Sequence, residues 1–353
     1  MTDEQQSQPP IPESPRAGDT ITTGNIAGVG IAIGMGASVT IYGDIHYYPI
    51  KLTAPLRALF APLIEDRVKL FAGRDAMFAW IMDCARAPAG SYSVITAPAG
   101  FGKTAAMAAL VHQTPQAFAF HFFTPLHSDT LEEQFFLRNV VQQMASWHGR
   151  KDEVSSDLNE LRALYQQFLN TPLEHTQVLV LDGLDEVATW RLAPYLSRRL
   201  PDRLHLVLTI RDTGQDWCAE YQLPADQVRH VPLDGLDRPT VASVLRAAEG
   251  PYGAVSQAIA DDLRQLDEIV RIAAYQANPV LGADPFYIRL LAEDVAAGVL
   301  ARTAIGSQPS GLDAYLDRWW KDIKQRAGDQ PTKDLFGTLT AALGPLSRAD
   351  LEA

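Results

Sequence analysis

Short apolar runs alternate with longer amphipathic stretches through the middle of the chain. Five apolar runs predict β-strands, at residues 91–97, 117–122, 177–182, 204–211 and 229–233. Helical periodicity separates them at 104–112, 130–147, 155–169 and 193–200. Continuous hydrophobicity, as opposed to alternation, is typical of strands buried on both faces. The pattern therefore predicts an α/β fold in which helices cover both faces of a parallel sheet and ligands bind at the carboxyl ends of the strands.

The pattern changes after Asp237. No further strand is predicted there, and helical periodicity covers residues 241–248, 256–274, 285–297 and 312–326. We expect a small helical domain over residues 237–328. Residues 329–353 resemble the beginning of a winged-helix domain, which needs more residues than remain. We therefore expect the sequence to be a piece of a longer protein.

The N-terminal part has a different composition. Residues 1–20 are polar, acidic and contain proline, so we expect a disordered tail. Residues 21–48 are a Gly-rich, β-prone leader without a charge before Asp44. Four interpretations compete: a membrane span, a dinucleotide-binding loop, a flexible leader and a self-assembling β-segment. The many glycines disfavour the first interpretation, and the wrong glycine spacing disfavours the second. The α/β domain is then expected over residues 49–236.

Composition narrows the class of protein. The chain has 353 residues, of which 47% are hydrophobic, which suffices for two or three domains with their own cores. Its net charge of −12 argues against a general nucleic-acid binder, because phosphate contacts need clustered Lys and Arg. Cys84 and Cys218 stand far apart, which fits buried thiols in a reducing cytoplasm. No signal peptide and no membrane association are expected.

One motif follows the first predicted strand. Residues 97–104 read Ala-Pro-Ala-Gly-Phe-Gly-Lys-Thr, a phosphate-binding loop in which Ala97 replaces the first glycine. Glycines allow successive backbone N–H groups to point at phosphate oxygens, and the following helix N-terminus also favours anions. Lys103 would contact the β- and γ-phosphates, and the Thr104 hydroxyl would ligate Mg²⁺. The first position makes the weakest demand for positive φ, so Ala97 is compatible with the motif.

Carboxylates follow the third predicted strand. The apolar run 178–181 ends in Asp182, which would stand beside the phosphate loop and hold Mg²⁺ directly or through water. Asp185 and Glu186 follow at once. Like charges so close together repel unless a cation or an attacking water uses them. The alternative is a solvated acidic loop, which the nearby phosphate loop disfavours.

These two motifs resemble the NACHT-type branch of the STAND signalling NTPases, which are relatives of AAA+ ATPases. The resemblance covers residues 66–353 and implies a P-loop NTPase fold, a three-layer parallel sheet followed by a helical lid and a winged-helix domain. It implies that Phe71, Gly73 and Arg74 run along the adenine, that Arg211 senses the γ-phosphate, and that Pro285 packs on the adenine. One extra residue separates Gly282 from Pro285, which departs from the family's spacing. The expected nucleotide-binding set is Phe71, Gly73, Arg74, Pro98, Ala99, Gly100, Phe101, Gly102, Lys103, Thr104, Ala105 and Pro285.

The resemblance also implies a function. ATP or ADP would bind with Mg²⁺ held by Thr104 and Asp182, ADP favouring a closed monomer and ATP an open form that assembles into a homo-oligomer. Hydrolysis would be slow, with Asp185, or in second place Glu186, polarising the attacking water beside Lys103 and Arg211. A cytoplasmic role in bacterial defence or transcriptional signalling follows from the family. The sensed ligand or protein is not visible in the sequence.

Two other functions remain open. An AAA+ initiator or loader acting on DNA would need a lid arginine aimed at the γ-phosphate, for which Arg289 is available. A nucleotide-dependent adaptor that never hydrolyses ATP would not need carboxylates at 182, 185 and 186.

Arg198, Arg199 and Arg203 could supply an arginine finger to a neighbouring subunit, although a solvated basic segment is the simpler interpretation. His121, inside an apolar run, is expected to be a core histidine.

Overall fold

The computed structural model describes residues 56–113, 118–149, 155–196 and 199–341. All of them belong to one compact unit, Leu52–Ala353. The predicted tail, the Gly-rich leader and residues 342–353 of the predicted winged-helix segment lie outside the described residues.

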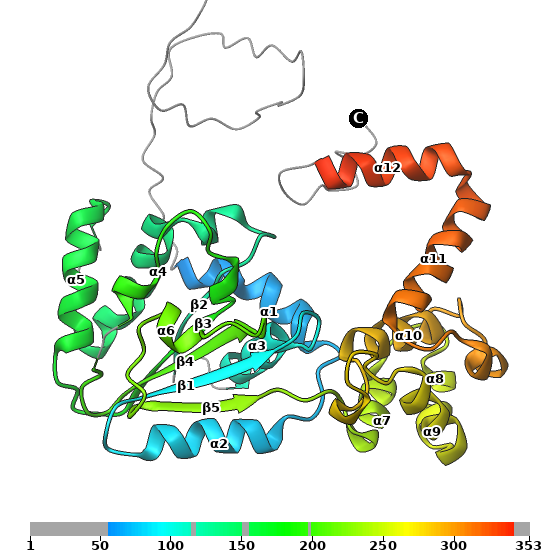
Figure 1. Cartoon of the computed structure of the whole chain (residues 1–353), viewed down its shortest axis with the longest axis horizontal. Helices are drawn as coiled ribbons and strands as arrows, with labels where there is room; N and C mark the ends of the chain where they lie inside the picture. The colour runs from blue at the N-terminus through cyan, green and yellow to red at the C-terminus, as the bar shows by residue number, and fades with distance from the viewer. Residues whose placement is uncertain (1–55, 114–117, 150–154, 197–198, 342–353) are drawn as a thin grey trace, which may run out of the picture. The chain divides into compact units, whose positions relative to one another are not determined.

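A five-stranded sheet forms the centre of the α/β region (Figure 1). Every pairing is parallel, and the strand order is β2-β3-β4-β1-β5. Nearly every residue of the inner strands is buried, which explains their continuous hydrophobicity, whereas the edge strand β5 is largely exposed. The strands are β1 Ser91–Ala97, β2 Phe118–Phe122, β3 Gln177–Asp182, β4 Leu204–Arg211 and β5 Val228–Pro232.

Helices cover both faces of this sheet. Along β4, Leu206 and Leu208 join one hydrophobic cluster and Val207 joins the other, because successive strand side chains point to opposite faces. The first cluster packs under α4 (Glu133–Trp147) and α5 (Leu158–Asn170). The second packs under α1 (Ala61–Val68), α2 (Asp75–Arg86) and α3 (Lys103–Gln113). The predicted three-layer α/β fold is confirmed.

A helical region follows the sheet. Its core contains Val241, Leu245, Ile269, Ile288 and Leu291, which lie at helical spacing on their elements. The helices are α7 Arg238–Ala247, α8 Gly253–Ala260, α9 Leu263–Ile272, α10 Pro285–Ala296, α11 Leu312–Ala327 and α12 Asp329–Ala341. The remaining short elements are α6 Trp217–Glu220 and the 3₁₀ turns η1 Leu56–Phe60, η2 Ser128–Leu131, η3 Leu184–Glu186, η4 Ala193–Tyr195, η5 Pro279–Leu281 and η6 Arg302–Ser307.

Two helix predictions are wrong. In the described residues of the stretch 193–200, which are 193–196 and 199–200, only the turn η4 forms, because the backbone is already extended at Leu196. The stretch 256–274 is two helices, since the side chain of Asp262 caps the N-terminus of α9 by accepting from the N–H groups of Arg264 and Gln265. Aspartate favours the start of a helix over its interior, because its carboxylate accepts from the backbone N–H groups that have no partner in the first turn.

His121 is the next-to-last residue of β2 and is fully buried. Its Nε2 donates to the carbonyl of Thr130 at 2.8 Å, and its Nδ1 accepts from the Asn139 side-chain amide at 3.1 Å. This arrangement fits the neutral ring alone, because a proton on Nδ1 would face another donor. Burial lowers the pKa of His121 to about 3. The prediction of a satisfied core histidine is confirmed.

The His121 site predicts acid sensitivity of the fold. The unfolded chain takes up this proton near pH 6.5 and the folded chain does so only near pH 3, so stability is lost as the pH falls between these values. The expected loss in the free energy of unfolding approaches about 1.4 kcal/mol for each pH unit below 6.5. Urea unfolding at pH 7, 6 and 5 measures it. His121→Gln should flatten this dependence and His175→Gln, at an exposed position, should not; parallel curves for the three proteins would contradict the assignment.

Candidate functional site

A pocket of about 510 Å³ opens at the carboxyl ends of the strands. One wall comes from the phosphate loop and from the loops that follow β2, β3 and β4. The other wall comes from the segment before α2 and from the helical region. The lining residues most relevant to chemistry are Phe71, Arg74, Gly100, Lys103, Thr104, Asp185, Glu186, Arg211, Pro285 and Arg289.

The phosphate loop connects β1 to α3, as the motif requires. Gly100 and Gly102 have φ of 81° and 83°, which favours glycine at both positions. Ala97 is the last residue of β1 and lies outside the positive-φ residues, so the missing first glycine costs nothing there. The Lys103 ammonium donates to the carbonyls of Ala97 and Pro98 at 3.0 and 3.2 Å. Burial lowers the pKa of Lys103, and the charges of Asp185 and Asp182 oppose that shift.

Asp182 ends β3 and is 1% exposed. Its Oδ1 accepts a hydrogen bond of 2.7 Å from Thr209 Oγ1, and Thr104 also hydrogen-bonds to this carboxylate. Burial raises the pKa of Asp182, while the hydrogen bonds and the charge of Lys103 oppose the shift. A carboxylate and a hydroxyl beside a phosphate-binding loop are a donor set that fits Mg²⁺, which usually takes one or two carboxylates together with substrate phosphates.

Thr209 is a site residue that the sequence analysis missed. Besides donating to Asp182, its Oγ1 accepts from the N–H of Gly183 at 2.8 Å, so one buried hydroxyl satisfies both groups where β3 ends. The available signal was a hydroxyl inside an otherwise apolar run, two residues before Arg211.

Arg211 ends β4 and forms ion pairs with both carboxylates of the acidic motif. Its Nε lies 3.2 Å from Asp185 Oδ2 and its Nη2 lies 3.2 Å from Glu186 Oε1. The Arg211 backbone N–H donates to the other Asp185 oxygen at 2.9 Å. Both oxygens of Asp185 are therefore engaged, whereas Glu186 uses one oxygen in this contact. β4, which ends in Arg211, lies directly beside β3, which ends in Asp182.

The segment before α2 joins the two regions. Leu70 and Ala72 pack against the helical core, whereas Phe71 packs against the α/β core and stacks on Phe78 at 5.8 Å. Gly73 has φ of 75°, and a Cβ there would approach Thr240 Oγ1 to 2.7 Å. Close packing and backbone geometry both require glycine at this position.

Arg74 links the phosphate loop to the segment that leads into the helical region. Its guanidinium donates to the carbonyl of Gly235 at 3.4 Å and to that of Phe101, in the phosphate loop, at 3.5 Å. Burial lowers the pKa of Arg74, and the charges of Asp234 and Asp237 oppose this. The Phe101 ring is fully buried and meets Tyr275 edge to face at 4.7 Å, so the loop also contacts the helical region directly.

Helix α10 completes the pocket. Pro285 is at its N-terminus, behind the capping carboxylate of Asp284, and lines the pocket together with Phe286. Arg289, one turn further along, also lines it, and its guanidinium lies 2.8 Å from Glu293 and 3.7 Å from Asp66.

Not every expected residue lines this pocket. Gly73, Pro98 and Asp182 lie next to lining residues but outside the lining itself. Arg199 pairs with Asp226 at 3.6 Å, and Arg203 donates to the carbonyls of Leu173 and Glu174, away from the pocket. Arg198 lies outside the described residues. Of the residues that the structure describes, no three His, Cys, Asp or Glu side chains form a metal-binding group, and no helix is long and apolar enough to span a bilayer.

Residues 72–211 match the family model described as Nephrocystin 3, N-terminal. This range contains the phosphate loop, Asp182 and Arg211. No curated protein sequence matches the chain.

Solved structures give further similarities. Drosophila ORC bound to DNA is 14% identical over 89% of this chain and 86% of that chain, with a TM-score of 0.37. Cdc6p from Pyrobaculum aerophilum is 18% identical over 71% of this chain and 62% of that chain, with a TM-score of 0.35. Domain III of the Thermotoga maritima replication initiation protein DnaA is 18% identical over 65% of this chain and 97% of that chain, with a TM-score of 0.32.

The Thr209 hydroxyl predicts a stability effect that depends on one atom. Thr209→Val removes the donor to Asp182 and the acceptor of the Gly183 N–H while it keeps the side-chain shape. The free energy of unfolding should fall by about 1–3 kcal/mol, because the Asp182 carboxylate loses one of its two hydroxyl donors and the Gly183 N–H loses its acceptor. Urea unfolding of the wild type, Thr209→Val and Thr209→Ser measures this. Thr209→Ser keeps the hydroxyl and should retain most of the stability; equal losses in the two variants would mean that the methyl group matters instead.

Proposed function

We propose that the chain is an ATP-binding switch of the STAND type that hydrolyses ATP slowly. The observation that carries the proposal is that one pocket is lined by Lys103, Thr104, Asp185, Glu186 and Arg211, with Arg74 and helix α10 on the opposite wall. Cations that can bind phosphate and carboxylates that can activate water thus converge where the helical region meets the α/β region.

Phosphate binding would use the loop and its lysine. Lys103 now donates to two carbonyls of its own loop, and a triphosphate would offer it stronger, charge-assisted acceptors. Thr104 and Asp182 would hold Mg²⁺ against the phosphates, and the ion would supply charge stabilisation to the transferring phosphoryl group. Phe71 and Pro285 would contact the base.

Arg211 is the proposed sensor of the γ-phosphate, and its present partners suggest how it works. It pairs with both Asp185 and Glu186, so the guanidinium holds the two carboxylates in place while the ion pairs persist. A γ-phosphate would compete for the guanidinium and release the carboxylates. ADP lacks that phosphate and would leave the pairs intact, which gives the two nucleotides the differential interaction that a switch requires.

Hydrolysis would then follow directly. A water oxygen attacks the γ-phosphorus, its proton passes to the freed Asp185 or Glu186 carboxylate, and the bond from the γ-phosphorus to the bridging oxygen breaks with its electron pair leaving on ADP. The need to displace Arg211 first accounts for slow turnover. Bound ATP would contact Arg74 and α10 and so move the helical region. The opened form would assemble into a homo-oligomer in the cytoplasm. The trigger that starts this change has unknown chemistry.

The second candidate is an initiator- or loader-type ATPase that acts on DNA. One observation favours it, since Arg289 of α10 lines the pocket, as expected of a lid arginine aimed at the γ-phosphate. The net charge of −12 weighs against DNA contacts. Turnover that DNA stimulates, with rapid nucleotide exchange, would favour this candidate over the switch.

Separate carboxylate variants test the proposed chemistry. Asp185→Asn should retain nucleotide affinity and lower kcat by about 100-fold or more, because it removes the proton acceptor. Asp182→Asn should weaken the Mg²⁺ dependence of binding itself. Calorimetry with MgATP and steady-state phosphate release measure the two effects, with Lys103→Ala as the variant that loses binding. If Glu186→Gln abolishes turnover and Asp185→Asn does not, Glu186 is the base; wild-type affinity in Lys103→Ala would contradict the phosphate-loop assignment.

A further inference from the structure

Two loops that border the pocket are also joined to each other away from it. The first is the β2–α4 loop, residues 123–132, whose first residues line the pocket. The second is the acidic segment, residues 183–196, which contains Asp185 and Glu186. The acidic segment has no regular structure beyond the turns η3 and η4 in its described length, so side-chain contacts must fix its course.

Next to the pocket, the two loops meet through their backbones. The N–H of Phe123 donates to the carbonyl of Asp182 at 2.9 Å. Gly183 has φ of 78°, and a Cβ on it would lie 2.7 Å from the Phe123 carbonyl oxygen. The acidic segment thus begins in close contact with the β2–α4 loop, and a shift of one loop would be transmitted to the other.

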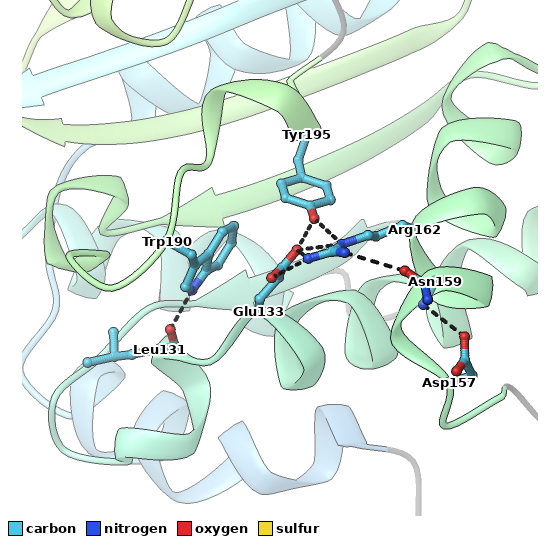
Figure 2. Close-up of polar contacts among 7 residues, drawn as sticks. All are labelled: Leu131, Glu133, Asp157, Asn159, Arg162, Trp190 and Tyr195. Atoms are coloured by element: carbon cyan, nitrogen blue, oxygen red, sulfur yellow. Dashed lines mark hydrogen bonds and ion pairs between the residues drawn. The ribbon is translucent and has the colours of Figure 1, made fainter. Parts of the chain in front are cut away.

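Trp190 makes the next connection, four residues after Glu186. Its indole Nε1 donates to the carbonyl of Leu131 at 2.7 Å (Figure 2). The ring stacks on Phe136 of α4 at 5.6 Å and meets Tyr195 edge to face at 5.5 Å. Trp190 therefore ties the acidic segment to the end of the β2–α4 loop and to the helix that follows.

Tyr195 makes the last connection, through an ion pair between helices. Figure 2 shows its hydroxyl pointing at Glu133 of α4, to which it donates a hydrogen bond. Arg162 of α5 holds the same carboxylate with two bonds of 2.8 Å and also donates to the Tyr195 hydroxyl at 3.0 Å. Gln166 of α5 donates to the Pro194 carbonyl at 3.0 Å. The end of the acidic segment is thus bound to both helices.

The ion pair of this network is too exposed to be a major source of stability, although the Tyr195 ring is buried. The Arg162 side chain is 44% exposed, and exposed ion pairs contribute about 0–1 kcal/mol. Its bonds are nevertheless directional, since a forked guanidinium fixes the Glu133 carboxylate that in turn receives the Tyr195 hydroxyl. Such contacts determine where a segment lies more than how stable the fold is.

We propose that Trp190 and Tyr195 are positioning residues that hold the acidic segment so that Asp185 and Glu186 face the phosphate loop. This role rests on the proposed hydrolysis of ATP. Neither side chain lines the pocket, so each acts through the carboxylates and not on the nucleotide. Displacement of a reacting group by about 1 Å can cost up to about 100-fold in rate, so loosening the segment should slow the chemical step while leaving nucleotide affinity intact.

Two conservative variants test the role. Trp190→Phe removes the indole N–H and Tyr195→Phe removes the hydroxyl, and both keep an aromatic ring in the core. Each should lower kcat by about 10-fold. The affinity for MgATP, measured by calorimetry, should stay at the wild-type value, and the midpoint of thermal unfolding should fall by no more than a few degrees. Tyr315→Phe is the matched control, because it also loses a hydroxyl bonded to a carboxylate, that of Asp294, but in the helical region; it should keep the wild-type kcat.

The results distinguish a failure of the positioning role from a failure of the proposed hydrolysis. Wild-type kcat in the double variant Trp190→Phe/Tyr195→Phe would overturn the positioning role and leave the proposed function standing. A parallel loss of kcat, affinity and thermal stability would also overturn it, since the residues would then be merely structural. Wild-type turnover no greater than that of Lys103→Ala would overturn the proposed hydrolysis, and the positioning role with it.

Discussion

The hydrogen bond from Thr209 to the buried Asp182 is the contact on which the rest of the site depends. It joins β4 to β3 where both strands end, and the same hydroxyl satisfies the N–H of Gly183 as the chain turns away. With that turn fixed, Asp185 and Glu186 face Arg211 at the end of the neighbouring strand. A buried carboxylate without a partner would carry a large desolvation cost. The hydrogen bonds that stabilise the ends of β3 and β4 therefore also position the carboxylates of the site.

The phosphate loop contacts the segment before the helical region and the helical region itself. Arg74 bonds to the carbonyls of Phe101 in the phosphate loop and of Gly235 just before the helical region, and the buried ring of Phe101 packs on Tyr275. Near these contacts the backbone of Gly235 runs so close to Ala283 that a Cβ would lie 2.6 Å from its carbonyl oxygen. A change in the loop that moved Phe101 would alter this contact with the helical region, which is how the proposed switch would couple the two.

The sequence predicted the sheet better than it predicted the site. Strands β1, β3 and β4 were placed to the residue, because burial on both faces demands uninterrupted hydrophobic runs. The turn at 193–195 was mistaken for a helix, since its course follows from tertiary contacts. Thr209, Trp190 and Tyr195 escaped notice for a related reason: their partners lie 26 to 62 residues away in the chain, and no local pattern encodes such pairs. The roles of the expected site residues stay predictions.

The central claim is that this pocket holds a nucleotide tightly enough to act as a switch. Acid extraction of the purified protein, followed by anion-exchange chromatography of the released nucleotides, tests it most directly. The account predicts stoichiometric ADP in the wild-type protein and none in Lys103→Ala. A wild-type protein that contains no nucleotide, and that also fails to bind added MgADP or MgATP, would contradict the account.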